Sequence, residues 1–350
     1  MLAAYRREFG CEGLFIGSEA GFESRLAPES GERAELISSL PWARQSWRGR
    51  LHAIVSVGPA FFAARRVLVR ERTELVIGTG GYASVPPCLA GWALGLPIAI
   101  HEANAVPGLA NRLLAHIASL ICVDSEETAK CFRSGWFVSS RVAVTGTPCH
   151  SLAPRPAPPE DALPNPPFRI IVLGGSEGSP WLNRRAPEML GELRRRSVEF
   201  TVHHLTGMEA PDATQAAYDR AGVSARVEGW VADMGPVYAD ATLAIASPGA
   251  RTLAELSSAG IPSLLTPLPG IAHGHHSANG RLYSVETGAR FVGEEEWDST
   301  ELAGWIHSLL SAPEVLRGIG QKMRSRAHPG AAEAIVREAE KLFGRREEAL

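Results

Sequence analysis

The sequence predicts an α/β protein made of two doubly wound domains that face a common cleft. Short apolar runs alternate with longer helical patterns along the chain, which is typical of βαβ units around parallel sheets. A proline-rich stretch near the middle separates these units into two sets. With 350 residues, 45% of them hydrophobic and 21% charged, the chain is long enough for each domain to bury a core of its own.

The domain boundary is predicted at residues 152–168, LAPRPAPPEDALPNPPF, which contain seven prolines. Proline at this density prevents both helix interiors and central strands. We therefore expect an N-terminal domain at 1–150, a linker at 151–168, a C-terminal domain at 169–330 and a final helix at 331–350.

Short apolar runs mark the predicted strands. They lie at 14–17, 75–77, 98–101, 121–124 and 142–145 in the first domain, and at 170–173, 198–203, 243–246 and 263–266 in the second. The opening residues, MLAAYRREFG, have the pattern of the second half of a helix, whereas an α/β domain normally begins with a central strand. The first domain is therefore expected to be incomplete at its start.

A glycine-rich loop, GGSEGS at 174–179, directly follows the predicted strand 170–173. Pro180 then occupies the first position of a predicted helix. Backbone amides at such a helix N-terminus bind phosphate groups. The same pattern also occurs as a plain turn, so the loop by itself leaves both interpretations open.

A second turn, Ser247-Pro248-Gly249, leads into a helix that carries Glu255 and ends at Gly260. A carboxylate near the start of such a helix can accept hydrogen bonds from both hydroxyls of a ribose. The alternative is a solvated glutamate that the helix dipole stabilises.

Composition argues against several other functions. A net charge of −3 disfavours general nucleic-acid binding, and five scattered cysteines without a C-x-x-C pair indicate a reduced compartment. No run of 18 apolar residues predicts a membrane-spanning helix. Residues 51–70, with Phe61 and Phe62 and a basic end, fit either a core helix or a segment lying in a membrane interface.

A metal site is the competing interpretation of AHGHHSANG at 272–280, since imidazole is a common metal ligand. His273, His275 and His276 are too close in sequence to converge on one ion unaided, and no cysteine or carboxylate is near. No metal is therefore expected.

Several segments in the same order resemble the MurG family of N-acetylglucosaminyltransferases, from about residue 10 to residue 310. The family pattern GGY.S.P is matched at 80–86, and HEQNAVPGLTNRLLA reads HEANAVPGLANRLLA at 101–115. VTGNPVR reads VTGTPCH, LGGSQGA..LN reads LGGSEGSPWLN, and SRAGALTVAELAAAGLPAILVPLP reads ASPGARTLAELSSAGIPSLLTPLP.

The resemblance implies the GT-B fold, with two Rossmann-like domains, and an inverting transfer of GlcNAc from UDP-GlcNAc to lipid I. The product would be lipid II, in peptidoglycan biosynthesis, a pathway that serves cell shape and cell division. The implied location is the cytoplasmic face of the inner (plasma) membrane, as a peripheral protein. Lipid I, the membrane surface and other cell-wall synthesis proteins are the implied partners. No cofactor is expected, because the chain has no D-x-D pair of carboxylates to hold a metal on the diphosphate.

The resemblance also implies site residues. Those on the donor side are Gly175, Ser176, Val231, Ala250, Arg251, Thr252, Glu255, His275, His276, Asn279 and His150. The 175–176 segment would hold the diphosphate and Glu255 the ribose. Val231 and the backbone of 250–252 would surround the uracil, whereas the 275–279 segment would reach the sugar. Gly81, Tyr82, His101 and Asn104 would line the acceptor side.

The chain departs from the family pattern at its start. Family members begin with a strand and the loop GGTGGH, whose histidine is the usual candidate for the general base, and no segment here matches that loop. Glu102 is therefore the predicted catalytic base. Thr147, His150 and His276 replace the family's asparagine, arginine and glutamine, which leaves donor affinity and sugar choice open.

Two other functions remain open on this evidence. A truncated, non-catalytic homologue would still bind a nucleotide sugar. A GlcNAc or other hexosyl transferase with a different lipid or small-molecule acceptor would keep the donor chemistry.

Overall fold

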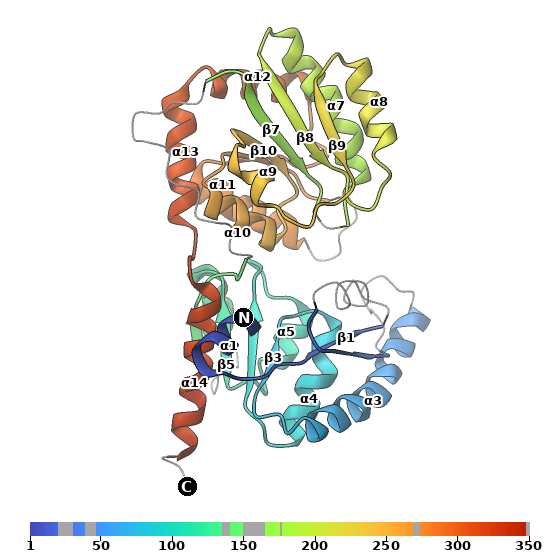
Figure 1. Cartoon of the computed structure of the whole chain (residues 1–350), viewed down its shortest axis with the longest axis vertical. Helices are drawn as coiled ribbons and strands as arrows, with labels where there is room; N and C mark the ends of the chain where they lie inside the picture. The colour runs from blue at the N-terminus through green and yellow to red at the C-terminus, as the bar shows by residue number, and fades with distance from the viewer. Residues whose placement is uncertain are drawn as a thin grey trace. The chain divides into compact units, whose positions relative to one another are not determined.

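The computed structural model describes residues 1–19, 31–38, 47–134, 141–149, 165–175, 177–268 and 274–347, with the backbone alone at 47–56 and 343–347. The chain divides into two compact units (Figure 1). Unit 1 combines Met1–Pro148 with Gly330–Leu350, and unit 2 is Cys149–Pro329. The final helix, predicted as a separate element, thus belongs to the same unit as the N-terminal domain.

Unit 2 is built on a six-stranded parallel sheet with the strand order β12-β11-β10-β7-β8-β9. The strands are β7 (Phe168–Leu173), β8 (Phe200–Leu205), β9 (Ala225–Glu228), β10 (Leu243–Ala246), β11 (Ser263–Leu265) and β12 (Arg290–Phe291). The helices are α7 (Pro180–Arg195), α8 (Asp212–Arg220), α9 (Gly235–Ala239), α10 (Ala250–Ala259), α11 (His275–Thr287), α12 (Ser299–Leu310) and α13 (Pro313–Ser325).

The central strand β7 is buried on both faces, which explains its continuous apolar sequence. Ile170 and Val172 pack in one core with residues of α7, α8 and α12. Ile171 and Leu173 point to the other face and join residues of α9, α10, α11 and α13. Alternation along one strand therefore gives the sheet a helical layer on each side, as Figure 1 shows.

Unit 1 contains a four-stranded parallel sheet in the order β3-β4-β5-β6 and a separate parallel pair, β1-β2. The strands are β1 (Phe15–Ser18), β2 (Ala34–Ile37), β3 (Val76–Gly78), β4 (Ile98–Glu102), β5 (Leu120–Val123) and β6 (Arg141–Val144). The helices are α1 (Leu2–Phe9), α3 (Trp47–Arg70), α4 (Val85–Ala93), α5 (Leu109–Leu114), α6 (Glu126–Arg133) and α14 (Ala331–Glu347).

The C-terminal helix α14 closes one face of the four-stranded sheet. Ile335, Val336 and Ala339 pack with Tyr5 of α1 and with Leu120 of β5. Burying apolar surface contributes roughly 25 cal/mol per Å² to stability. These contacts therefore hold the last helix of the chain against the first.

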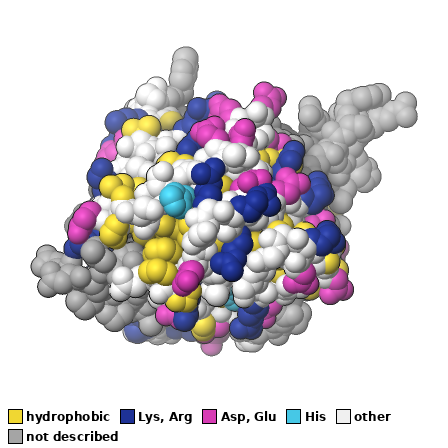
Figure 2. All heavy atoms as spheres, turned by 90° about the horizontal axis from the view of Figure 1, so that it is seen from above, with side chains coloured by type: hydrophobic (Ala, Val, Ile, Leu, Met, Phe, Trp, Pro, Cys, Tyr) yellow, Lys and Arg dark blue, Asp and Glu magenta, His cyan; other side chains and the backbone are white. Residues whose placement is uncertain are grey.

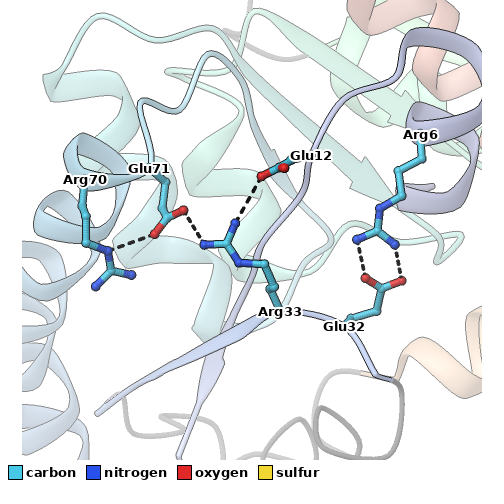
Figure 3. A network of polar contacts seen from close by, with 6 residues as sticks. All are labelled: Arg6, Glu12, Glu32, Arg33, Arg70 and Glu71. Atoms are coloured by element: carbon cyan, nitrogen blue, oxygen red, sulfur yellow. Dashed lines mark hydrogen bonds and ion pairs between the residues drawn. The ribbon is translucent and has the colours of Figure 1, made fainter.

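Surface ion pairs join the first residues of the chain to later segments of unit 1 (Figure 3). Arg6 donates two hydrogen bonds to Glu32, at 2.7 and 2.6 Å. Arg33 reaches both Glu12 and Glu71, at 3.4 and 2.6 Å. Because water screens such exposed pairs, they orient α1 and the segment before β2 more than they stabilise them.

The predicted fold class, two α/β domains built on parallel sheets, is confirmed, and every predicted strand is present with bounds within two residues. Three strands were not predicted: β2, β9 and β12. Among the helices that the structure describes, none is both long and apolar enough to cross a bilayer.

Candidate functional site

The sheet of unit 2 has a topological switch point beside β7. Strand β8 lies on one side of β7 and β10 lies on the other. The helices that follow β7 and β10 cover opposite faces, since α7 contributes to one core and α10 to the other. Ligands of open α/β sheets bind outside the carboxyl ends of the strands at such a point. The loops after β7 and β10 are therefore the primary candidates for a binding site.

The loop after β7 combines glycines of positive φ with the start of a helix. Gly175 is exposed with φ +84°, and Gly178 has φ +81°, so both adopt a backbone conformation that favours glycine. Ser179 accepts a hydrogen bond from the Leu182 amide at 3.2 Å, and Pro180 begins α7. Backbone amides at the start of this helix carry the positive end of its dipole. Ser176 lies outside the described residues.

A buried network of polar side chains holds the segment against which this loop packs. Tyr218 donates to His204 Nδ1 at 3.0 Å, His204 Nε2 donates to Asn183 Oδ1 at 3.0 Å, and Asn183 Nδ2 donates to the Thr206 carbonyl at 3.2 Å. Burial lowers the pKa of His204 to about 3, so the imidazole is neutral. A neutral ring can accept a hydrogen bond at Nδ1 and donate one from Nε2. The network fixes the Thr206-Gly207 segment, against which Gly178 packs.

The helix after β10 carries Glu255, which is only 7% exposed. Its carboxylate accepts hydrogen bonds from Tyr238 and Arg251. A buried carboxylate requires such partners. This placement excludes the alternative of a solvated helix glutamate and puts the acid in the helix that starts at the switch point.

The other predicted donor residues of unit 2 gather around the turn at 247–249. Asn279 is buried, and its side-chain amide donates to the Pro248 carbonyl at 3.1 Å. His276 approaches Gly249, since a Cβ on that glycine would lie 3.8 Å from Nε2. Burial, and then the neighbouring His275, lower the pKa of His276, which keeps this ring neutral at pH 7.

The backbone segment 250–252 forms the first turn of α10, with Ala250 and Thr252 half-buried and Arg251 exposed. Val231 is half-buried against the core that includes α10. His150, the last predicted donor residue, lies outside the described residues.

The predicted acceptor residues lie at the carboxyl ends of two adjacent strands of unit 1. Gly81 and Tyr82 follow β3, whereas His101 belongs to β4 and Asn104 follows it. His101 is buried and its Nε2 donates to the Gly146 carbonyl at 3.0 Å, while burial lowers its pKa. We infer that His101 joins β4 to the segment after β6 as a neutral ring.

Glu102 is only 3% exposed and accepts four hydrogen bonds. The amide and the side chain of Asn104 donate to Oε1 at 2.9 Å each. The Gly108 amide and Asn111 Nδ2 donate to Oε2 at 2.8 and 3.0 Å. Both carboxylate oxygens thus hold the loop 103–108 in its conformation, which favours a structural role for Glu102. Glu102 as the general base stays a prediction, and the geometry gives it little support.

Two features of the site escaped sequence reasoning. Asn111 lies inside the matched motif at 101–115, yet its contact with Glu102 depends on the fold of the loop. Thr147 donates to Asp124 Oδ1 at 2.6 Å, joining the segments that follow β6 and β5. Within the described residues no cluster of three or more histidine, cysteine or acidic side chains could hold a metal ion.

Comparison with known proteins identifies the family. The model of the glycosyltransferase family 28 N-terminal domain matches residues 3–123, and that of the family 28 C-terminal domain matches residues 169–337. A protein of Magnetococcus marinus is 33% identical over 95% of this chain and 90% of its own length. It is named UDP-N-acetylglucosamine--N-acetylmuramyl-(pentapeptide) pyrophosphoryl-undecaprenol N-acetylglucosamine transferase, the enzyme called MurG. The chain belongs to the MurG group of glycosyltransferase family 28.

Further relatives agree with this assignment. A Pelobacter propionicus protein of the same name is 33% identical and covers 93% of this chain and 90% of its own length. The crystal structure of Acinetobacter baumannii MurG matches with a TM-score of 0.75 and 27% identity, covering 97% of this chain and 94% of that one. A Neisseria meningitidis UDP-GlcNAc 2-epimerase shares the fold, with a TM-score of 0.67 at 13% identity, 97% of this chain and 94% of that one being covered.

Proposed function

We propose that this MurG-group glycosyltransferase moves N-acetylglucosamine from UDP-GlcNAc to lipid I, the undecaprenyl-linked acceptor, and releases UDP. The near full-length match to transferases that carry this activity in their name is the observation on which the proposal depends. The switch point of unit 2 supports it, because a glycine-rich loop at a helix N-terminus suits a diphosphate and a buried carboxylate on the next helix suits a ribose.

The reaction assigns a task to each group at this site. The acceptor hydroxyl forms a bond to the anomeric carbon while the bond from that carbon to the diphosphate breaks, with inversion. The loop at Gly175 and the start of α7 would hold the diphosphate as its charge develops. Glu255 would hold the ribose and, together with the turn at 247–249, fix the donor for in-line attack. The acceptor hydroxyl gives its proton to a general base.

Replacing Glu255 by Ala should abolish transfer. The test is transfer of labelled GlcNAc from UDP-GlcNAc to a soluble lipid I analogue, with UDP binding measured by calorimetry on the same samples. Glu188→Ala on α7, an exposed acid paired with Arg185, is the matched control and should leave both readouts unchanged.

Each outcome of this assay decides between functions. Transfer by the wild-type chain that is lost in Glu255→Ala supports the proposal. If the wild type binds UDP but transfers no GlcNAc, the result would instead favour a non-catalytic homologue that binds a nucleotide sugar. Transfer of GlcNAc to a different acceptor, but not to the lipid I analogue, would overturn the assignment of lipid I.

We also propose that unit 1 binds the membrane surface peripherally, which a lipid-linked acceptor requires. Exposed apolar side chains lie on two helices that contact each other and on the loop before the second of them: Trp92 of α4, Val106 between β4 and α5, and Leu109 and Leu113 of α5. Arg112 is exposed on the same short helix and could meet anionic headgroups. Phe62 of α3 is also exposed, as the membrane interpretation requires, whereas Phe61 packs against the core.

A vesicle experiment tests this surface. The double variant Leu109→Glu, Leu113→Glu should bind liposomes of phosphatidylglycerol and phosphatidylethanolamine at least tenfold more weakly, because both apolar contacts are replaced by charges that anionic lipid repels. Val285→Glu, an exposed apolar position in unit 2, is the control and should bind like the wild type. Equal binding of all three proteins in co-sedimentation would contradict the proposal.

One face of unit 2 carries side chains of both charges. Figure 2 shows acidic and basic side chains interspersed over the described part of the face that is seen from above. General nucleic-acid binding uses a broad basic surface that neutralises several phosphates.

A further inference from the structure

The contacts of the Glu255 carboxylate come from two different elements. Tyr238 of α9 donates its hydroxyl hydrogen to Oε2 at 2.8 Å. Arg251, one turn before Glu255 on α10, donates from Nε to Oε1 at 3.1 Å. Tyr238 is 2% exposed, whereas the Arg251 side chain is 66% exposed. One partner is therefore fixed in the core, and the other lies at the solvent side.

Tyr238 acts only as a donor at this position. Burial, and then the charge of Glu255, raise its pKa well above the ordinary value of 10, so the hydroxyl keeps its hydrogen throughout the physiological range. The aromatic ring packs among buried residues of α10 and β10, which limits its rotation. A rigid donor on one oxygen sets the orientation of the whole carboxylate plane.

The two contacts leave acceptor capacity on the carboxylate. Each ionised oxygen has about two lone-pair positions, and each is shown with one donor here. Each oxygen can therefore accept one more hydrogen bond, and the two hydroxyls of a vicinal diol supply two donors. A carboxylate that turned freely would meet two such hydroxyls only in a fraction of its orientations.

We propose that Tyr238 is a positioning residue that orients Glu255 toward the ribose diol and thereby sets a preference for ribonucleotides over deoxyribonucleotides. The inference rests on the proposed function, in which Glu255 contacts the ribose of UDP-GlcNAc. It adds a residue from a different element and a specificity that the fold by itself does not imply.

The test compares two ligands on one variant, by isothermal titration calorimetry on the full chain. Tyr238→Phe removes the hydroxyl and keeps the ring. UDP should bind about tenfold more weakly, because a hydrogen bond to a charged group no longer orients the carboxylate. 2′,3′-Dideoxy-UDP has no diol to meet the carboxylate, so its affinity should stay within about twofold.

Tyr218→Phe is the matched control. It removes another buried hydroxyl of unit 2, one that donates to His204 and not to Glu255. Any general loosening of the domain should shift the affinities of UDP and its dideoxy analogue by the same factor in this variant. Only Tyr238→Phe should reduce the ratio between the two ligands.

The outcomes separate the two proposals. If the wild type binds UDP and Tyr238→Phe weakens both ligands equally, or neither, the positioning role is wrong while the donor site stands. If the wild type binds UDP no better than its dideoxy analogue, Glu255 does not read the diol and the inference fails with the ribose assignment. Failure of the wild type to bind UDP at all would overturn the proposed function itself.

Discussion

Glu102→Gln should lower the melting temperature of unit 1 by about 10 °C. A glutamine has one carbonyl oxygen, so whichever way it lies, two of the four donors around Glu102 face an amide nitrogen. Leaving such buried donors unsatisfied costs about 1–3 kcal/mol each, and 1 kcal/mol shifts the midpoint of a domain of this size by about 2–4 °C. Thermal unfolding followed by circular dichroism measures the effect.

The same variant separates a structural role from a catalytic one. Glu127→Gln, which removes a half-exposed carboxylate of α6 in the same unit, should leave the midpoint unchanged. A double-mutant cycle of Glu102→Gln with Asn111→Ala should be strongly non-additive, because the two side chains share a hydrogen bond. An unchanged midpoint with a fall in kcat of about 10²–10⁴ would instead identify Glu102 as the base.

Gly178→Ala should disrupt the diphosphate loop. A Cβ at this position would lie 2.1 Å from the Thr206 carbonyl oxygen, and the residue has φ +81°. The left-handed conformation alone costs about 1–2 kcal/mol, and the clash with backbone adds to it. Because Thr206 is held by the network of Asn183 and His204, the loop has to move instead, and UDP should bind at least tenfold more weakly.

Gly222→Ala isolates the steric effect. Gly222 also has a positive φ, of +66°, but a Cβ there would meet nothing within 4 Å, and the residue lies between α8 and β9, away from the carboxyl ends of the strands. This variant should lose only the stability that the left-handed conformation costs an alanine, and it should bind UDP as tightly as the wild type. Equal effects of the two substitutions on the urea midpoint and on UDP binding would contradict the packing argument.

Much of the fold was readable from the sequence, because strands buried on both faces need continuous apolar runs. The runs at 170–173 and 243–246 are of this kind and lie at the centre of the sheet. The missed strands lie at sheet edges or outside the main sheets. β9 (ARVE) and β2 (AELI) are only partly buried and carry charged residues, and β12 has two residues. Partial burial removes the apolar signal that the prediction used.

The loops of the candidate site were also predictable, since glycines and helix starts after apolar strands mark the carboxyl edge of a parallel sheet. The sequence by itself determined the two parallel α/β domains, the residues at their strand ends and, through five matched segments, the family. Only the tertiary structure decided what each polar side chain does. A glutamate at position 102 could act as a base or hold a loop in place, and its sequence context is the same in both cases. The structural role is indicated by four hydrogen-bond donors, which the fold of residues 104–111 brings to the carboxylate. Tyr238 and Glu255 are 17 residues apart on different helices, so their contact depends on how α9 and α10 pack, which no local pattern encodes.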